Sequence, residues 1–417
     1  MNLDIHQDAA STRHKAWYST PRVPGTVAYR DFHFRAPSPV LMAPTVSELH
    51  AAVRAGHADE IRKALAGGAS VESAEQETQQ TLLHTAALAG NVEIAQLLLD
   101  AGAKSSPPAS LVHAPTGLTV TGATPLHFAS SVAHSLGHLA VVKLLLSRGG
   151  DVHSVTGKGG SPLQAAADNG NAAACRLLVA AGADINAAVM SGATPLHAAA
   201  AHGDVSTVAA LLELGADATA KDRNGGETAL HAASRLGRTG AAAVLILKAK
   251  SDVMARATFV MDNGHAVHNS TCLHLAASFG HDGVMAMLLQ AGAEAAAESE
   301  GGFTPLHAAS YNGHATCVAL LLAMGVSPAL TTSAGGYQPL HSASMAGQVA
   351  TGALLLDAGA HIDAATSSGD TALMLAAAGG HVAAVQALLA RGANKDTVNA
   401  EGATAKSKAS EACISLL

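Results

Sequence analysis

Aromatic residues are scarce in this chain of 417 residues, which contains one tryptophan, four tyrosines and six phenylalanines. Charged residues are also sparse, at 13% of the composition, and the formal net charge is −7. A nucleic-acid surface needs a concentrated basic stripe, so this balance argues against nucleic acid as a partner. Because 49% of the residues are nonetheless apolar, we expect a core built mainly of alanine, leucine and valine.

Cysteine is rare too, and the four cysteines lie far apart in the sequence, at Cys175, Cys272, Cys317 and Cys413. Their spacing matches no disulfide framework or zinc site, which favours a reducing compartment. No apolar run approaches the length of a membrane span, and acidic residues occupy the stretch that would be apolar in a signal peptide. We therefore expect a cytoplasmic protein without membrane insertion.

The chain does contain one sequence motif that recurs ten times and is clearest as TPLHAA at residues 194–199 and 304–309. Successive copies are 33 to 43 residues apart. A period near 33 that carries T-P-L-H-x-A resembles the ankyrin repeat, and the resemblance covers nearly nine-tenths of the chain. The leucine of the motif is found at Leu49, Leu83, Leu126, Leu163, Leu196, Leu230, Leu273, Leu306, Leu340 and Leu373.

The resemblance implies an all-α repeat solenoid, in which helix-turn-helix units carry β-hairpin fingers and stack into a curved rod. It divides the chain into an N-terminal arm (1–44), ten repeats (45–394) and a degenerate capping repeat with a tail (395–417). Two fingers are longer than the repeat requires, at 104–121 and 252–270. The first of them contains prolines and is expected to be a surface loop.

Within one repeat the residue types follow from helix chemistry. Thr194 suits an N-cap and Pro195 suits the first helical position, where a missing N–H costs nothing. In the family, the ring at His197 bonds to neighbouring threonine and backbone groups and so connects adjacent loops. Gly215 ends the second helix in a position that favours a left-handed conformation. Lys250 stands in that position in repeat 6, so the chain is expected to turn differently there.

Two further departures concern segments that interrupt the period. Four extra residues in 131–136 are expected to lengthen or bulge the first helix of repeat 3. The long finger at 252–270 holds apolar residues that include Phe259 and Met261. If these apolar residues are exposed, the finger, including Phe259, could be a contact element. The alternative is that the finger folds back on its neighbours.

The arm at 1–44 is basic, with a formal charge of +2, and prolines argue against a helix there. Its aromatic content is unlike that of a disordered tail. We expect an extended arm whose aromatic side chains dock either on the repeats or on another protein. These anchors are Trp17, Tyr18, Tyr29, Phe32 and Phe34.

Ankyrin proteins typically bind through a concave face made of finger tips and the ends of the first helices. In repeats 7 to 9 these positions are unusually aromatic, and equivalent residues of neighbouring repeats lie side by side. Contiguous exposed apolar surface marks an interaction site, although each ring could instead pack locally on the next finger. The expected partner-binding residues are Phe279, Phe303, Tyr311, Tyr337 and Met345.

The sequence therefore indicates a non-enzymatic scaffold or adaptor that binds one or more proteins through its concave face and its arm. Two separate sites on a rod would suit a structural part of a cytoskeletal or ciliary assembly. The alternative is a transient regulatory or substrate-recognition subunit of an enzyme complex such as a ubiquitin ligase. No cofactor or metal is expected, because the cluster of His265, His268, Cys272 and His274 fits no zinc spacing.

Overall fold

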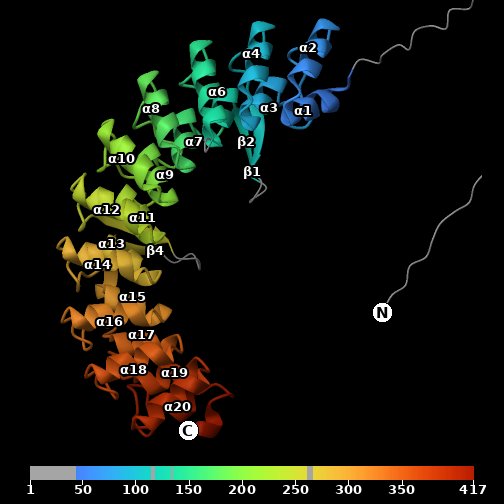
Figure 1. The fold of residues 1–417 in the computed structure, drawn as a ribbon. Helices are drawn as coiled ribbons and strands as arrows, with labels where there is room; N and C mark the ends of the chain where they lie inside the picture. The colour runs from blue at the N-terminus through green and yellow to red at the C-terminus, as the bar shows by residue number, and fades with distance from the viewer. Residues whose placement is uncertain (1–43, 114–117, 133–134, 261–265) are drawn as a thin grey trace, which may run out of the picture. The chain divides into compact units, whose positions relative to one another are not determined.

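A row of ten helix pairs forms the described part of the chain (Figure 1). The computed structural model describes residues 44–113, 118–132, 135–260 and 266–417. Each first helix packs on the next first helix, and each second helix on the next second helix. The helical repeat solenoid expected from the sequence is confirmed.

In chain order, the helix pairs are α1 (Val46–Ala55) and α2 (Ala58–Ala66), α3 (Leu82–Ala89) and α4 (Val92–Asp100), α5 (Pro125–Ser131) and α6 (Leu136–Ser147), α7 (Pro162–Asp168) and α8 (Ala172–Ala180), α9 (Pro195–His202) and α10 (Val205–Glu213), α11 (Ala229–Arg235) and α12 (Thr239–Leu247), α13 (Cys272–Ser278) and α14 (Asp282–Gln290), α15 (Pro305–Asn312) and α16 (Ala315–Ala323), α17 (Pro339–Met345) and α18 (Val349–Asp357), and α19 (Ala372–Ala378) and α20 (Val382–Ala390).

The core is a continuous strip between the first and second helices. Leu196, Val208 and Leu211 of the fifth pair are almost completely buried, and Ala199 fills the space between them. Each fully buried leucine or valine stabilises the fold by about 1.5–3 kcal/mol. The small alanine side chains allow the first helices of neighbouring pairs to approach closely, which explains why so few aromatic residues suffice.

In most repeats the motif histidine holds the first helix to the following finger, by which we mean the segment between one helix pair and the next. The Thr194 N–H donates to His197 Nδ1 at 3.1 Å, and His197 Nε2 bonds to the Glu227 carbonyl at 2.9 Å. Since Nδ1 accepts from an N–H, the ring is neutral with its proton on Nε2. The same arrangement recurs at His84, His127, His231, His274 and His307.

The end of α12 differs from the other second helices, as expected. After α4, the Ala103 N–H donates to the Leu98 carbonyl, five residues back. After α12, the Ser251 N–H reaches the Leu245 carbonyl, six residues back, so the turn holds one more residue. Lys250 nevertheless adopts the left-handed conformation with φ 51°.

Replacement of Lys250 by glycine should therefore stabilise the protein. A side chain in the left-handed region costs about 1–2 kcal/mol, although the gain is reduced by the greater freedom of glycine in the unfolded chain. We expect an increase of about 1 kcal/mol in the free energy of unfolding, measured by urea denaturation. Lys248→Gly is the matched control, because Lys248 is right-handed (φ −89°, ψ −46°) and its replacement should destabilise. Equal effects of the two changes would contradict this account.

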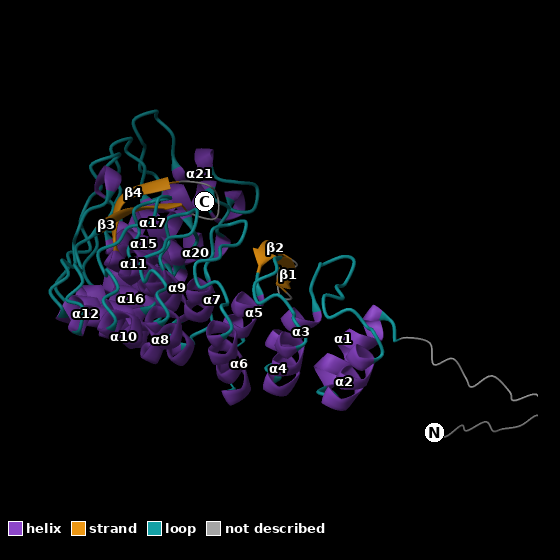
Figure 2. Cartoon of the chain, turned by 90° about the horizontal axis from the view of Figure 1, so that it is seen from above, coloured by secondary structure: helices purple, strands orange, loops and turns teal. Residues whose placement is uncertain are grey.

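Both long fingers form β-hairpins on the side where the fingers project (Figure 2). The first pairs β1 (Ala109–His113) with β2 (Leu118–Ala123), so the expectation of a loop at 104–121 was wrong. The second pairs β3 (Arg256–Val260) with β4 (Ala266–Thr271). The β-branched residues in β2 and β3 favour extended backbone, a signal that the prolines of the first finger outweighed in the sequence-based prediction.

The extra residues at 131–136 also act differently from the expectation. The first helix, α5, is not lengthened: it has 7 residues, as does α7. The second helix, α6, is longer instead, with 12 residues against 9 in α4. Residues 133–134 lie outside the described part of the chain.

The last repeat is a short cap. Its first helix, α21 (Ala405–Lys408), covers the end of the core, with Ala405 and Cys413 buried. Lys408 Nζ donates to Asp370 Oδ1 at 2.6 Å and connects the cap to the finger between α18 and α19. The chain ends in a 3₁₀ turn, η2 (Ile414–Leu416).

Candidate binding groove

One backbone hydrogen bond joins each finger to the next at eight of the nine finger junctions. In each, an N–H of the later finger donates to a carbonyl of the earlier one at 2.7–3.1 Å. These bonds make the fingers a continuous surface, which we call the finger face. The donor and acceptor pairs are Ser110–Thr78, Gly157–Thr121, Met190–Lys158, Arg223–Ser191, Thr258–Gly225, Ala334–Gly301, Ser367–Gly335 and Ala400–Ser368.

The exception lies between β4 and the finger that contains η1 (Glu300–Gly302). Among the described residues, no backbone hydrogen bond crosses this junction. His268 and Glu300 occupy the positions that bond elsewhere, and their side chains approach instead, with His268 Nε2 3.8 Å from Glu300 Oε2. A side chain does connect the two fingers: Arg256 Nη1 donates to the Asn269 carbonyl at 3.0 Å and to the Glu298 carbonyl at 2.6 Å.

A groove of about 710 Å³ opens where the finger face is interrupted. One wall is the β3–β4 hairpin, with Phe259 and Val267, and the opposite wall carries Phe303 from the next finger. Tyr311 at the end of α15 and Met345 at the end of α17 complete the apolar lining. This volume is in the range of sites that hold small ligands or peptide side chains.

The floor of the groove is polar but uncharged at neutral pH. His274 and His307 lie there, and burial lowers the pKa of each ring to about 4. Both rings already bond to backbone carbonyls through Nε2, at Phe303 and Tyr337 respectively. The rim adds Ser278 and Asn312, whose amide donates to the Ala308 carbonyl. The groove therefore combines aromatic walls, neutral polar groups and one carboxylate, Glu300.

The structure brings together four of the side chains singled out in the sequence: Phe259, Phe303, Tyr311 and Met345 line the groove. Phe279 lies behind the hairpin wall, its ring centroid 5.6 Å from that of Phe259, and so holds the wall rather than forming it. Tyr337 is not part of the lining; its ring packs edge-on against His341 at 6.2 Å, as that of Phe303 does against His307 at 5.7 Å. The hairpin thus packs on the end of α13, and its Phe259 and Val267 line the groove.

Exposure separates these residues from ordinary core residues. Phe279, Phe303, Met345 and Tyr311 keep 38%, 40%, 43% and 44% of their surface accessible. The anchors expected in the arm, Trp17, Tyr18, Tyr29, Phe32 and Phe34, lie outside the described residues.

Sequence reasoning missed the hairpin residues Val267 and His268 and the finger residue Glu300. A signal was available: at all eight bonded junctions the acceptor stands three places before the motif threonine or its equivalent, and at five of them the donor stands four places before the next such position. At this junction they are His268 and Glu300, and no other junction brings two ionisable side chains together in this way.

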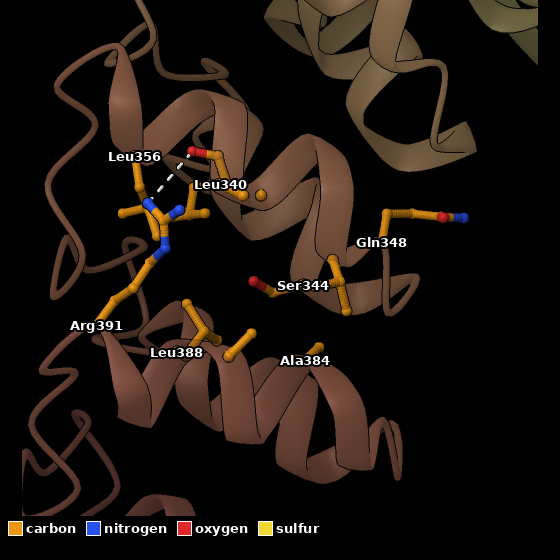
Figure 3. A pocket seen from close by; sticks show the side chains of 11 residues that line it. Leu340, Ser344, Gln348, Leu356, Ala384, Leu388 and Arg391 are labelled. Carbon is orange, nitrogen blue, oxygen red and sulfur yellow. Dashed lines mark hydrogen bonds between the residues drawn. The ribbon is translucent and has the colours of Figure 1, made fainter.

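A second hollow lies between α17, α18 and α20 and has no comparable character (Figure 3). Its volume is about 20 Å³, enough for one water molecule. Leu340, Leu356 and Leu388 line it, and Arg391 donates to the Ala353 carbonyl across it at 3.5 Å. It is a packing gap between helices rather than a site.

Two other kinds of site find no support in the described part of the chain. No group of three or more histidine, cysteine, aspartate or glutamate side chains in the described ranges is arranged to hold a metal ion. None of the described helices combines the length and the apolar character that a membrane span requires.

The fold is that of a helical repeat protein whose fingers form a face interrupted by one groove in the described part of the chain. The family model described as ankyrin repeats (3 copies) matches residues 49–156, 131–222, 163–257, 256–332 and 325–399. These segments cover most of the sequence, so the chain belongs to the ankyrin-repeat family. Its repeats form a protein–protein interaction domain.

Individual relatives match only in part. Tyrosine-protein kinase HTK16 of Hydra vulgaris is 35% identical over 71 residues, which are 17% of this chain and 9% of that protein. The chain thus spans less than a tenth of the length of this curated relative. Among solved structures, the human ASB11 ankyrin repeat domain is 31% identical and has a TM-score of 0.48. The match covers 55% of this chain and 97% of that domain.

Proposed function

We propose that the chain is a non-enzymatic scaffold or adaptor that holds a segment of a partner protein in the groove between the β3–β4 hairpin and α15. The observation that carries the proposal is the one interruption of the finger face found among the described residues, which coincides with a gathering of exposed aromatic side chains. Elsewhere on the finger face adjacent fingers are bonded together. Aromatic residues dominate binding energy when they are gathered in a sheltered site.

The aromatic arm at residues 1–44 is a second, separate anchor in this proposal. A chain with two anchors joins components, either permanently as a structural part or transiently as a recognition subunit. Extraction with salt separates these cases, because a permanent part stays with its assembly and a recognition subunit exchanges freely.

The groove is tested by selecting short peptides from a random displayed library on the full-length chain and measuring their affinity by fluorescence anisotropy. Phe303→Ala and Tyr311→Ala should each weaken binding about tenfold or more, since truncation of an aromatic anchor costs about 2 kcal/mol or more. Both side chains are exposed, so the melting temperature should change little.

Met324→Ala is the matched control, because Met324 is an equally exposed apolar residue (54%) at the end of α16, outside the groove lining. It should leave peptide affinity unchanged. Selected peptides that bind both groove variants as tightly as the natural chain would show that recognition lies elsewhere.

A further inference from the structure

Charge is distributed very unevenly along the chain. Between Arg256 and Arg391 there is no lysine or arginine, but there are eight aspartates and glutamates. The chain as a whole has 24 basic residues, so this stretch departs sharply from the rest. It contains α13 to α20 and therefore nearly all of the groove.

Two of these acids are paired with basic side chains outside the groove. Asp357 pairs with Arg391 at 2.6 Å and Asp370 pairs with Lys408 at 2.6 Å. The remaining acids include Glu298 and Glu300, which are exposed on the finger that forms the groove wall.

In the described part of the chain, neither Glu298 nor Glu300 has a lysine or arginine side chain within 4 Å of its carboxylate. Arg256 contacts this finger, but its guanidinium donates to the backbone carbonyls of Asn269 and Glu298 rather than to a carboxylate. Among the described residues, His268 is the titratable side chain paired with Glu300, with its Nε2 3.8 Å from Glu300 Oε2. The buried rings of His274 and His307 are neutral at physiological pH, because their pKa is about 4. The groove therefore has aromatic walls and a net negative rim.

We infer that the groove takes a basic and apolar segment of a partner protein: an aromatic or branched aliphatic side chain flanked by lysine or arginine. The inference rests on the proposed function. The apolar side chain would lie between Phe303 and Met345, where it loses contact with water. A neighbouring lysine or arginine would face Glu300 and the ring of Tyr311, which offers a cation–π contact. Complementary charge also suppresses acidic competitors.

Two synthetic peptides test this inference on the full-length chain by fluorescence anisotropy. The first has the sequence Gly-Lys-Arg-Trp-Leu-Arg-Lys-Gly, and the second has glutamine in place of every lysine and arginine. We expect the basic peptide to bind about tenfold more tightly at low salt, with the difference shrinking as salt screens the rim charges. Equal affinity of the two peptides, or failure of the basic peptide to bind, would overturn the inference.

The double variant Glu298→Gln/Glu300→Gln should weaken binding of the basic peptide about fivefold at low salt and leave the neutral peptide unaffected. The matched control is Glu401→Gln, because Glu401 is exposed at the tip of the last finger, away from the groove. If the basic peptide binds the double variant normally but is lost on Phe303→Ala, the groove is a binding site without charge selection. If the basic peptide binds the Phe303→Ala and Tyr311→Ala variants normally, it binds elsewhere, and both this inference and the proposed function fail.

Discussion

Acidification from pH 6.5 to pH 4 should destabilise the protein strongly. All eight motif histidines have a lowered pKa, chiefly because of burial, and for His84, His231, His274 and His307 the value is about 4 instead of 6.5. A shift of this size corresponds to about 3 kcal/mol per ring. We therefore expect a fall of several kcal/mol in stability, seen as a melting temperature that decreases steadily across this pH window.

The direction of this change in stability follows from the number of protons that the folded and unfolded chains bind. Unfolded histidines bind protons near pH 6.5, whereas the folded rings remain neutral until about pH 4, so in this window the unfolded chain binds more protons and stability decreases with falling pH. A protonated histidine ring could no longer accept, at Nδ1, the hydrogen bond from the backbone N–H of the N-cap residue, which is Thr194 in the case of His197. Burial raises the pKa of Asp168 and Glu227 and acts in the opposite direction, but these are two groups against eight.

The chain itself supplies a suitable control, because Gln164 stands in the motif position of the fourth repeat. His231→Gln should lower the melting temperature at neutral pH, since the bond to the Ala255 carbonyl is lost, yet the variant should lose less stability on acidification. A melting temperature that is constant down to pH 4 and then collapses would assign acid unfolding to carboxylates instead.

Gly225→Ala should displace the β3–β4 hairpin and thereby impair the groove without touching any residue in it. A Cβ atom at Gly225 would lie 2.1 Å from the Thr258 carbonyl oxygen, far inside contact distance. The Thr258 N–H donates to the Gly225 carbonyl at 2.7 Å, so relief of the clash also strains this bond. We expect a loss of about 1–3 kcal/mol in stability and at least a tenfold loss of peptide affinity.

The neighbouring glycine serves as control. Gly226 has φ 73°, so Gly226→Ala is strained by about 1 kcal/mol, but its Cβ would meet only Lys221 Cδ at 3.8 Å. This variant should lose comparable stability and keep its peptide affinity. If both variants bind peptide normally, the position of the hairpin does not shape the site.

The repeat fold was predictable because each repeat has similar residue types at the same positions. A threonine cap, a proline at the first helical position, a histidine and a terminal glycine fix two helices and a turn, and repetition removes ambiguity. Phe303, Tyr311 and Met345 were predictable as neighbours for the same reason, since they occupy finger and helix-end positions of successive repeats.

The departures from the period were less predictable. A long finger can become a loop or a hairpin according to pairing between its two halves, and β-strand pairing depends on contacts that a local pattern does not show. Tyr337 occupies the same repeat position as Phe303, and each ring packs edge-on against its motif histidine, yet only Phe303 lines the groove, because the β3–β4 hairpin forms the opposite wall there. The missing hydrogen bond between β4 and the next finger depends on the hairpin geometry, including the bulge at which Asn269 adopts φ 58°.

The central claim is that a partner segment occupies the interruption in the finger face. Hydrogen–deuterium exchange of the full-length chain, with and without a selected peptide, tests it most directly. We expect added protection in β4 and at residues 299–312, with α17 affected near Met345 and the fingers of the first five repeats unchanged. Protection confined to other repeats, or none at saturating peptide, would contradict the account.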